Sequence, residues 1–102
     1  MELRQLRYFV AVVELGSLSK AADAVHISQS ALSLQIARLE DELDTQLLSR
    51  SSRGVLPTEA GIEFCRRARA VLQQISQMKE KAPQSATGLR GTVTIGLPAS
   101  VA

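Results

Sequence analysis

The sequence predicts a mainly α-helical fold: a winged helix-turn-helix of three helices and a β-hairpin, then one long helix and one C-terminal strand. Three observations support this prediction. Apolar residues recur every three or four positions up to Leu43, with breaks near Gly16 and Ser28. Two short apolar runs flank a tip of Ser, Arg and Gly at positions 49–54. A further helical pattern follows Thr58 and meets no proline before Pro83.

Length and composition restrict the class of protein. The chain has 102 residues, of which 45% are hydrophobic, 22% charged and 3% aromatic. These values are typical of a small globular domain and exclude a large multidomain enzyme or a disordered tail. The few aromatic residues argue against stacking on single-stranded bases. The charged N-terminus lacks a continuous apolar run, so we expect neither a signal peptide nor a membrane span. We therefore expect a cytoplasmic location.

One cysteine and one histidine limit the available chemistry. Cys65 cannot form an internal disulfide, and with His26 as the single histidine we expect no metal site and no cofactor. We expect Cys65 to pack as a small buried apolar group and His26 to be structural. Because the sequence lacks a nucleophile motif and a Gly-rich phosphate loop, it predicts a protein that is not an enzyme.

Three helices are predicted in the first part of the chain, each with one apolar side. In the first helix this side is formed by Leu3, Leu6, Val10 and Val13. Gly16 is expected to end that helix, and Ser17 to be the N-cap of a short second helix. Ser28 is the expected N-cap of the third helix, whose apolar side is formed by Leu32, Ile36, Leu39 and Leu43. The three apolar sides are expected to share one core.

The opposite side of the third helix is unusual for a surface exposed to water. On a helical wheel it carries Ser30, Leu34, Ala37 and Asp41, flanked by Ser33 and Arg38. Exposed helices are usually rich in Lys and Glu, whereas small hydrogen-bonding side chains with one cation indicate a docking surface. The acids that follow would repel phosphate, and we expect them to form a solvated end of the helix: Glu40, Asp41, Glu42 and Asp44.

The next part of the chain predicts a hairpin and a long helix. Residues 46–57 suit a small hairpin with Arg50 and Arg53 at its tip, and Thr58 is the expected N-cap of the helix. The helix carries a heptad seam that predicts dimerisation: Phe64, Ala68, Val71, Ile75, Met78 and Ala82. The alternative is a helix that lies along its own domain, and we expect Phe64 and Ala68 to contact that core.

The residues LRQLRYFVAVVELGSLSKAADAVHISQSALSLQIARLEDELDTQLLSRSSRGVLPTEAG resemble the N-terminal region of LysR-type transcriptional regulators. The later segment LRGTVTIGLP resembles the start of that family's effector-binding domain, and is similar to its nitrogen-assimilation-control branch.

The predicted organisation has four parts. Residues 1–58 are a winged helix-turn-helix DNA-binding domain, 59–83 a linker or dimerisation helix and 84–91 a hinge. Residues 92–102, with an alternating strand that lacks a partner, are expected to begin a truncated effector-binding domain.

The resemblance implies a sequence-specific transcription regulator that binds an interrupted palindrome in double-stranded DNA as a homodimer or tetramer. A small-molecule effector is implied for the full-length protein only. The third helix would enter the major groove, with contacts carried over to its N-terminal residues: Ser28, Gln29, Ser30, Ser33 and Leu34. Gln29 can pair with adenine. Leu34 departs from the longer polar or cationic residue often seen in the family and suggests contact with a thymine methyl; its alternative is packing against a neighbouring chain or the wing.

Further contacts implied by the resemblance are to the DNA backbone. Arg38 is expected to bind phosphate, and the wing residues Arg50 and Arg53 to lie near the backbone or minor groove, where Thr58 can add a hydrogen bond. Residues 1–58 hold six cations and seven acids, a net charge of −1, while residues 59–102 hold six and three, a net charge of +3. DNA affinity must therefore depend on where the cations lie. A winged-helix module that binds another protein is the alternative function.

Overall fold

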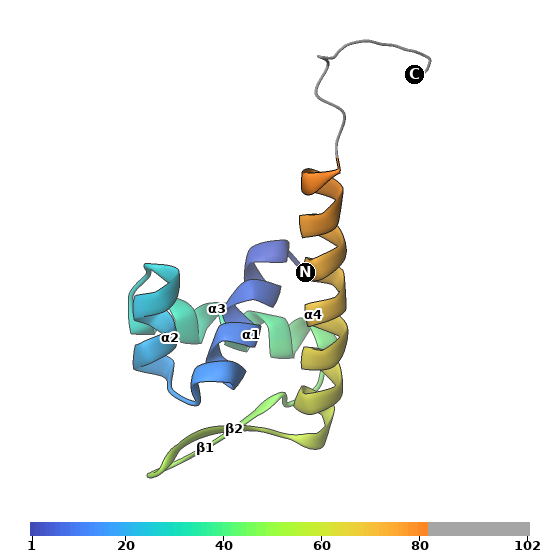
Figure 1. Ribbon diagram of the computed structural model, residues 1–102. Helices are drawn as coiled ribbons and strands as arrows, with labels where there is room; N and C mark the ends of the chain where they lie inside the picture. Colours follow the sequence, from blue (N-terminus) through green and yellow to red (C-terminus); the bar gives the residue numbers. More distant parts are fainter. Residues whose placement is uncertain (82–102) are drawn as a thin grey trace, which may run out of the picture.

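The computed structural model describes residues 1–81. They form α1 (Leu3–Leu15), α2 (Leu18–Val25), α3 (Gln29–Leu43), β1 (Leu48–Ser51), β2 (Gly54–Pro57) and α4 (Glu59–Glu80). In Figure 1, α1, α2 and α3 cluster beside the lower part of α4, and the β1–β2 hairpin projects beneath them. The winged helix-turn-helix and the long helix are thus confirmed. The predicted hinge, the predicted strand and Ala82 of the seam lie outside the described residues.

The predicted N-caps are confirmed by hydrogen bonds from the first turn of each helix. Ser17 Oγ accepts from the Lys20 amide at 3.2 Å, and Ser28 Oγ from the Ala31 amide at 3.1 Å. Such bonds satisfy amides that have no partner within the helix. Gly16 ends α1 in the left-handed conformation, with φ 65°, as glycine does most easily.

The core lies where α1, α2 and α3 meet α4. Leu32, Ile36 and Leu39 of α3 are fully buried, as the helical wheel predicts. On α1 the prediction is wrong for Leu3, which is 42% exposed in the first turn, so the buried stripe begins one turn later. Phe9 of α1 packs edge-on against Phe64 of α4, with ring centroids 5.6 Å apart, and thereby joins the two helices.

The hairpin that forms the wing is short and is fixed to the body by two buried side chains, Leu48 of β1 and Val55 of β2. Strands β1 and β2 pair antiparallel, with Leu48 opposite Pro57 and Ser51 opposite Gly54. Val55 is 8% exposed and joins the core, whereas the Arg50 side chain directly across the ladder is exposed. Residues paired across an antiparallel ladder share a face, so Arg50 lies on the same face of the wing as Val55, the face turned toward the body.

The start of α4 is held against the chain that enters the wing. The Thr58 amide donates to the Leu47 carbonyl at 3.0 Å, and the Thr58 hydroxyl donates to the Gln46 carbonyl at 2.7 Å. A Cβ atom on Gly61 would lie 2.0 Å from the Leu47 carbonyl oxygen, so only glycine fits at this position. The direction of α4 relative to the wing is consequently set by backbone contacts.

Candidate nucleic-acid interface

The outward side of α3 is the first part of the candidate interface. Ser30, Leu34, Ala37 and Arg38 are exposed there, and Ser33 is half-buried. Leu34 has 50% of its surface exposed and is absent from the core cluster. The exposed side of α3 that the helical wheel predicts is thus confirmed. This surface carries small polar groups, one apolar side chain and one cation.

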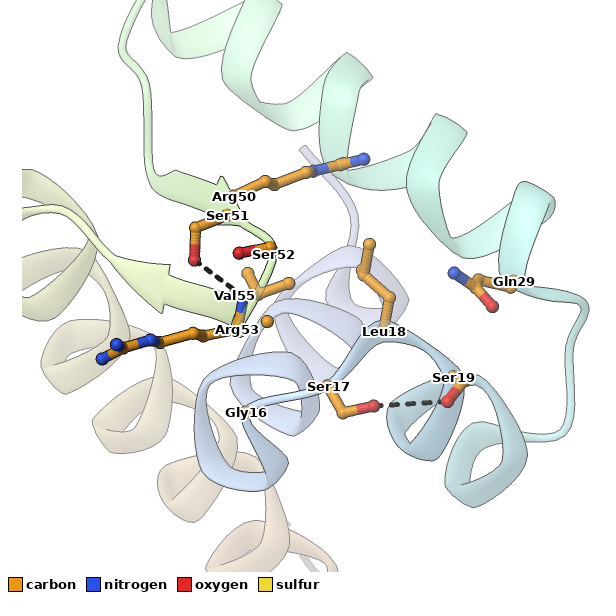
Figure 2. A pocket seen from close by; sticks show the side chains of 11 residues that line it. Gly16, Ser17, Leu18, Ser19, Gln29, Arg50, Ser51, Ser52, Arg53 and Val55 are labelled. Carbon is orange, nitrogen blue, oxygen red and sulfur yellow. Dashed lines mark hydrogen bonds between the residues drawn. The ribbon is translucent and has the colours of Figure 1, made fainter.

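The N-terminal turn of α3 and its cap carry three polar side chains, those of Ser28, Gln29 and Ser30. The Ser28 hydroxyl caps the helix and lies 3.2 Å from Ser30 Oγ, so its oxygen already has two protein partners. Gln29 is exposed, and its side chain points into the hollow beside Leu18 (Figure 2). Of these three predicted contact residues, Gln29 and Ser30 leave the most polar capacity for a partner.

An open hollow of about 450 Å³ separates the wing from the start of α2 and α3. It is lined by Gly16, Ser17, Leu18, Ser19, Gln29 and residues 50–55. Figure 2 shows the Arg50 side chain extending toward α3, whereas Arg53 extends the opposite way. The two arginines therefore diverge, although they are close in sequence. Gln29 and Arg50 border the same hollow from two elements.

The arginines of this region differ in their partners from the three arginines of α4. Within residues 1–81, Arg38, Arg50 and Arg53 form no salt bridge with the protein. By contrast, Arg66 and Arg67 both pair with Glu63, and these bonds lower the pKa of the Glu63 carboxyl to about 2. Arg69 pairs with Glu14. The guanidinium groups beside α3 and on the wing therefore remain available for an external anion.

Two predicted roles need correction. Thr58 uses its only hydroxyl proton on the Gln46 carbonyl, so it cannot donate to a phosphate, and its function is to cap α4. Glu40 does not belong to a solvated acidic end. It is half-buried, and its carboxylate accepts from the amides of Leu47 and Leu48 at 2.8 and 3.1 Å. Asp41, Glu42 and Asp44 are exposed as predicted.

The predicted seam on α4 divides into two parts. Ala68 is 3% exposed and Phe64 packs against the core, so both contact their own domain as expected. Val71 and Met78 are 41% and 71% exposed, and Ile75 is half-buried. At the other end of the seam lies an apolar groove of about 310 Å³, lined by Leu43, Thr45, Leu47, Ala60, Glu63, Phe64 and Arg67.

The described residues include the single cysteine of the chain. Cys65 is 2% exposed, and burial raises the pKa of its thiol, which confirms the expected role as a small buried group. Among residues 1–81 there is no group of three His, Cys, Asp or Glu side chains arranged to hold a metal ion. No helix in that range is long and apolar enough to cross a membrane.

Residues 3–62 match a family described as bacterial regulatory helix-turn-helix protein, lysR family. The chain belongs to the lysR family. This lysR-family chain is 50% identical over 97 residues to the nitrogen assimilation regulatory protein nac of Klebsiella aerogenes, and the match covers 95% of this chain. It spans only 32% of that relative's length. The likeness supports the nitrogen-assimilation-control branch that the C-terminal segment suggested.

Solved structures of other lysR-family proteins confirm the fold. The crystal structure of the BenM DBD with catB site 1 DNA has a TM-score of 0.82 and 50% identity, and the match covers 86% of this chain and 99% of that one. The CbnR DBD–DNA complex has a TM-score of 0.77 and 39% identity, covering 88% of this chain and all of that one. The winged helix-turn-helix with its long helix is therefore the fold of DNA-bound members of the family.

Sequence reasoning misses two polar residues that join separate elements of the fold, Glu40 and Gln5. Glu40 was grouped with three neighbouring acids because the sequence holds no sign that its carboxylate meets backbone amides seven and eight residues later. Gln5 was not singled out; it is 7% exposed and donates to Gln35 on α3 at 3.1 Å, a contact between helices that are distant in sequence. An isolated polar residue on the apolar side of a helix was the available signal for Gln5.

Proposed function

We propose that this chain is the DNA-reading part of a lysR-family transcription regulator, with α3 in the major groove and the wing against the adjoining backbone or minor groove. The observation that carries the proposal is the exposed, nearly uncharged N-terminal part of α3 beside three arginines that have no acidic partner in the described chain. The BenM and CbnR relatives were crystallised with DNA, which supports the same partner here. The proposal assigns no catalytic step and no cofactor to the chain, and places it in the cytoplasm with the chromosome.

Base recognition is assigned to the side chains of α3. Gln29 has an amide that can bond adenine N6 and N7 at once, and Ser30 and Ser33 can reach base edges or phosphate. Leu34 lacks any donor for guanine, and its exposed methyl groups suit the thymine methyl, the apolar group on a base-pair edge in the major groove. Ser28 contributes chiefly by capping the helix that presents these groups.

Backbone contacts are assigned to Arg38 on α3 and to Arg50 and Arg53 on the wing. Phosphate binding by cations supplies most of the salt-dependent affinity for DNA. Since Arg50 extends toward α3 and Arg53 away from it, the two side chains can contact different phosphates or opposite sides of a minor groove. The net charge of residues 1–58 is −1 with these three arginines included, so DNA affinity depends on where the cations lie rather than on the net charge.

The exposed part of the α4 seam is assigned to the interface of a homodimer. Two such dimers can form a tetramer of the full-length regulator. A two-fold axis pairs residues reciprocally. Consider two antiparallel α4 helices whose two-fold axis passes near Val71. In that arrangement Met78 of each chain lies against the groove beside Phe64 of the other chain. This arrangement covers both exposed apolar regions at once, whereas a parallel pair leaves the groove open. The small-molecule effector belongs to the part of the regulator beyond this chain.

The DNA-binding proposal is tested with sites selected by the chain from a random duplex library. Binding is then measured by fluorescence anisotropy between 50 and 200 mM salt, where each phosphate contact contributes a slope of about −0.9. Three contacts predict a slope of about −2.7 for each chain bound. Failure to enrich any site, together with a flat salt response, would instead favour the protein-binding module.

The role of Leu34 is tested on the selected site with single thymine-to-deoxyuridine replacements, each of which removes one methyl group. At one position in each half-site we expect affinity to fall about fourfold, the value of one buried methyl group. Leu34→Ala should abolish that sensitivity, while thymines elsewhere serve as internal controls. Equal sensitivity in the two proteins would assign Leu34 to packing.

A further inference from the structure

The side chain of Glu40 links the recognition helix to the wing. Its Oε2 atom accepts from the backbone amides of both Leu47 and Leu48, at 2.8 and 3.1 Å. These two residues are 1% and 4% exposed and lead directly into β1. Without Glu40 their amides would lose these partners in a buried place, which is costly because water cannot replace them there.

The loop that receives Glu40 is held from the other side by α4. The carbonyls of Gln46 and Leu47 accept from the hydroxyl and amide of Thr58, at 2.7 and 3.0 Å, and Gly61 packs directly on the Leu47 carbonyl. The Gln46 side chain also donates to the Leu48 carbonyl at 2.9 Å. Residues 46–48 are therefore a joint at which α3, the wing and α4 are fixed to one another.

We propose that Glu40 is a positioning residue for DNA binding: it fixes the wing relative to α3 so that both engage DNA together. The inference rests on the proposed function. Arg50 lies two residues beyond Leu48 on β1, so the anchored amide of Leu48 sets the direction in which Arg50 leaves the body. That direction brings Arg50 to the hollow it shares with Gln29 of α3.

Electrostatics alone makes the opposite prediction for Glu40. An acid on a helix that docks to DNA repels phosphate, so its removal should strengthen binding. A positioning role requires that its removal weaken binding, because the wing arginines then lose their fixed place. Asp41 provides the matched control: it is the neighbouring acid on the same helix, and its exposed side chain forms no hydrogen bond or salt bridge in the described part of the chain.

The test compares Glu40→Gln with Glu40→Asp in the chain bound to its selected DNA site. Gln keeps the side-chain length and one oxygen that can accept from both amides, but it loses the charge. Asp keeps the charge but is shorter by one methylene and cannot reach both amides. We expect Gln to bind within about threefold of the unmodified chain and Asp to bind about tenfold more weakly.

Two further readouts separate positioning from general loss of structure. In Glu40→Asp the amides of Leu47 and Leu48 should exchange hydrogen faster, while the amide of Leu39, a fully buried residue of α3, stays protected. The salt slope should become shallower by about 0.9 for each phosphate that the wing no longer binds. Asp41→Ala should bind at least as tightly as the unmodified chain, with an unchanged slope.

Each outcome supports or overturns the inference. If Glu40→Asp binds as well as the unmodified chain, the reach of the Glu40 side chain is not needed and the inference is wrong. If Glu40→Gln strengthens binding as Asp41→Ala does, Glu40 acts only as a repelling charge and the inference is also wrong. Should Glu40→Asp fail to fold, Glu40→Gln still decides, since a tenfold loss with intact folding would show that charge rather than length matters. A chain that selects no DNA site refutes the proposed function instead.

Discussion

The two halves of α4 carry one apolar repeat but lie in different surroundings. In the first half, Ala68 of this repeat is 3% exposed, and Phe64 packs against the core of its own domain. In the second half, Val71 and Met78 of the same repeat are 41% and 71% exposed. The difference shows that a heptad repeat identifies an apolar stripe without identifying what covers it. Here one half completes the domain, and the other is left for a second chain.

The largest effect is expected in the first half, from Gly61→Ala. Alanine favours a helix over glycine by about 1 kcal/mol. The new Cβ would lie 2.0 Å from the Leu47 carbonyl oxygen, a backbone atom that cannot move aside as a flexible side chain can. We expect overpacking to dominate and to lower the free energy of unfolding by about 3 kcal/mol.

Urea unfolding followed by circular dichroism at 222 nm measures the effect of Gly61→Ala. Gln73→Ala is the matched control, because Gln73 is an exposed residue of the same helix where the new side chain meets no close contact. Its unfolding midpoint should stay the same or rise slightly. An unchanged midpoint for Gly61→Ala would mean that α4 can shift away from the wing, and the joint would not be rigid.

The second half is tested with Ile75→Asp, which places a charge in the exposed seam. A buried unpaired carboxylate costs several kcal/mol, so we expect the dimer dissociation constant to rise about a hundredfold or more. The domain itself should keep its fold, because Ile75 lies beyond the core cluster. Sedimentation velocity across a range of concentrations gives the measurement. Gln73→Asp, on the opposite side of α4, should leave the dimer intact; equal losses would place the interface elsewhere.

Local features of this fold could be predicted from the sequence, whereas contacts between distant segments could not. The caps at Ser17 and Ser28 and the outward face of α3 depend on residues within four positions of one another. Glu40 and Thr58 were misassigned because their partners lie seven to twelve residues away along the chain. The divergence of Arg50 and Arg53 has another cause: it depends on the conformation of the turn between β1 and β2, which residue types alone do not determine.

A smaller effect is expected where the two halves of α4 meet. Arg69 lies 3.2 Å from Glu14 of α1, but both side chains are more than half exposed. Water and salt screen such a pair, so Arg69→Ala should destabilise the chain by about 0.5 kcal/mol or less. Repeating the urea titration at 0.1 and 1 M salt should reduce even this difference. A loss comparable to that of Gly61→Ala would show that the second half is fixed to the body by this pair.

The smallest effect concerns Glu63, at the edge of the groove in the first half of α4. Hydrogen bonds from Arg66 and Arg67 lower the pKa of its carboxyl from 4.5 to about 2. A lowered pKa in the folded chain means that the ionised form stabilises the fold above pH 4.5 and that this contribution disappears as the pH falls toward 2. The free energy of unfolding of Glu63→Gln should therefore be slightly lower than that of the unmodified chain at pH 7 and equal to it near pH 2. Because half of the Glu63 side chain is exposed, salt should weaken the difference. An NMR titration midpoint near 4.5 would show that the arginines do not hold the carboxylate.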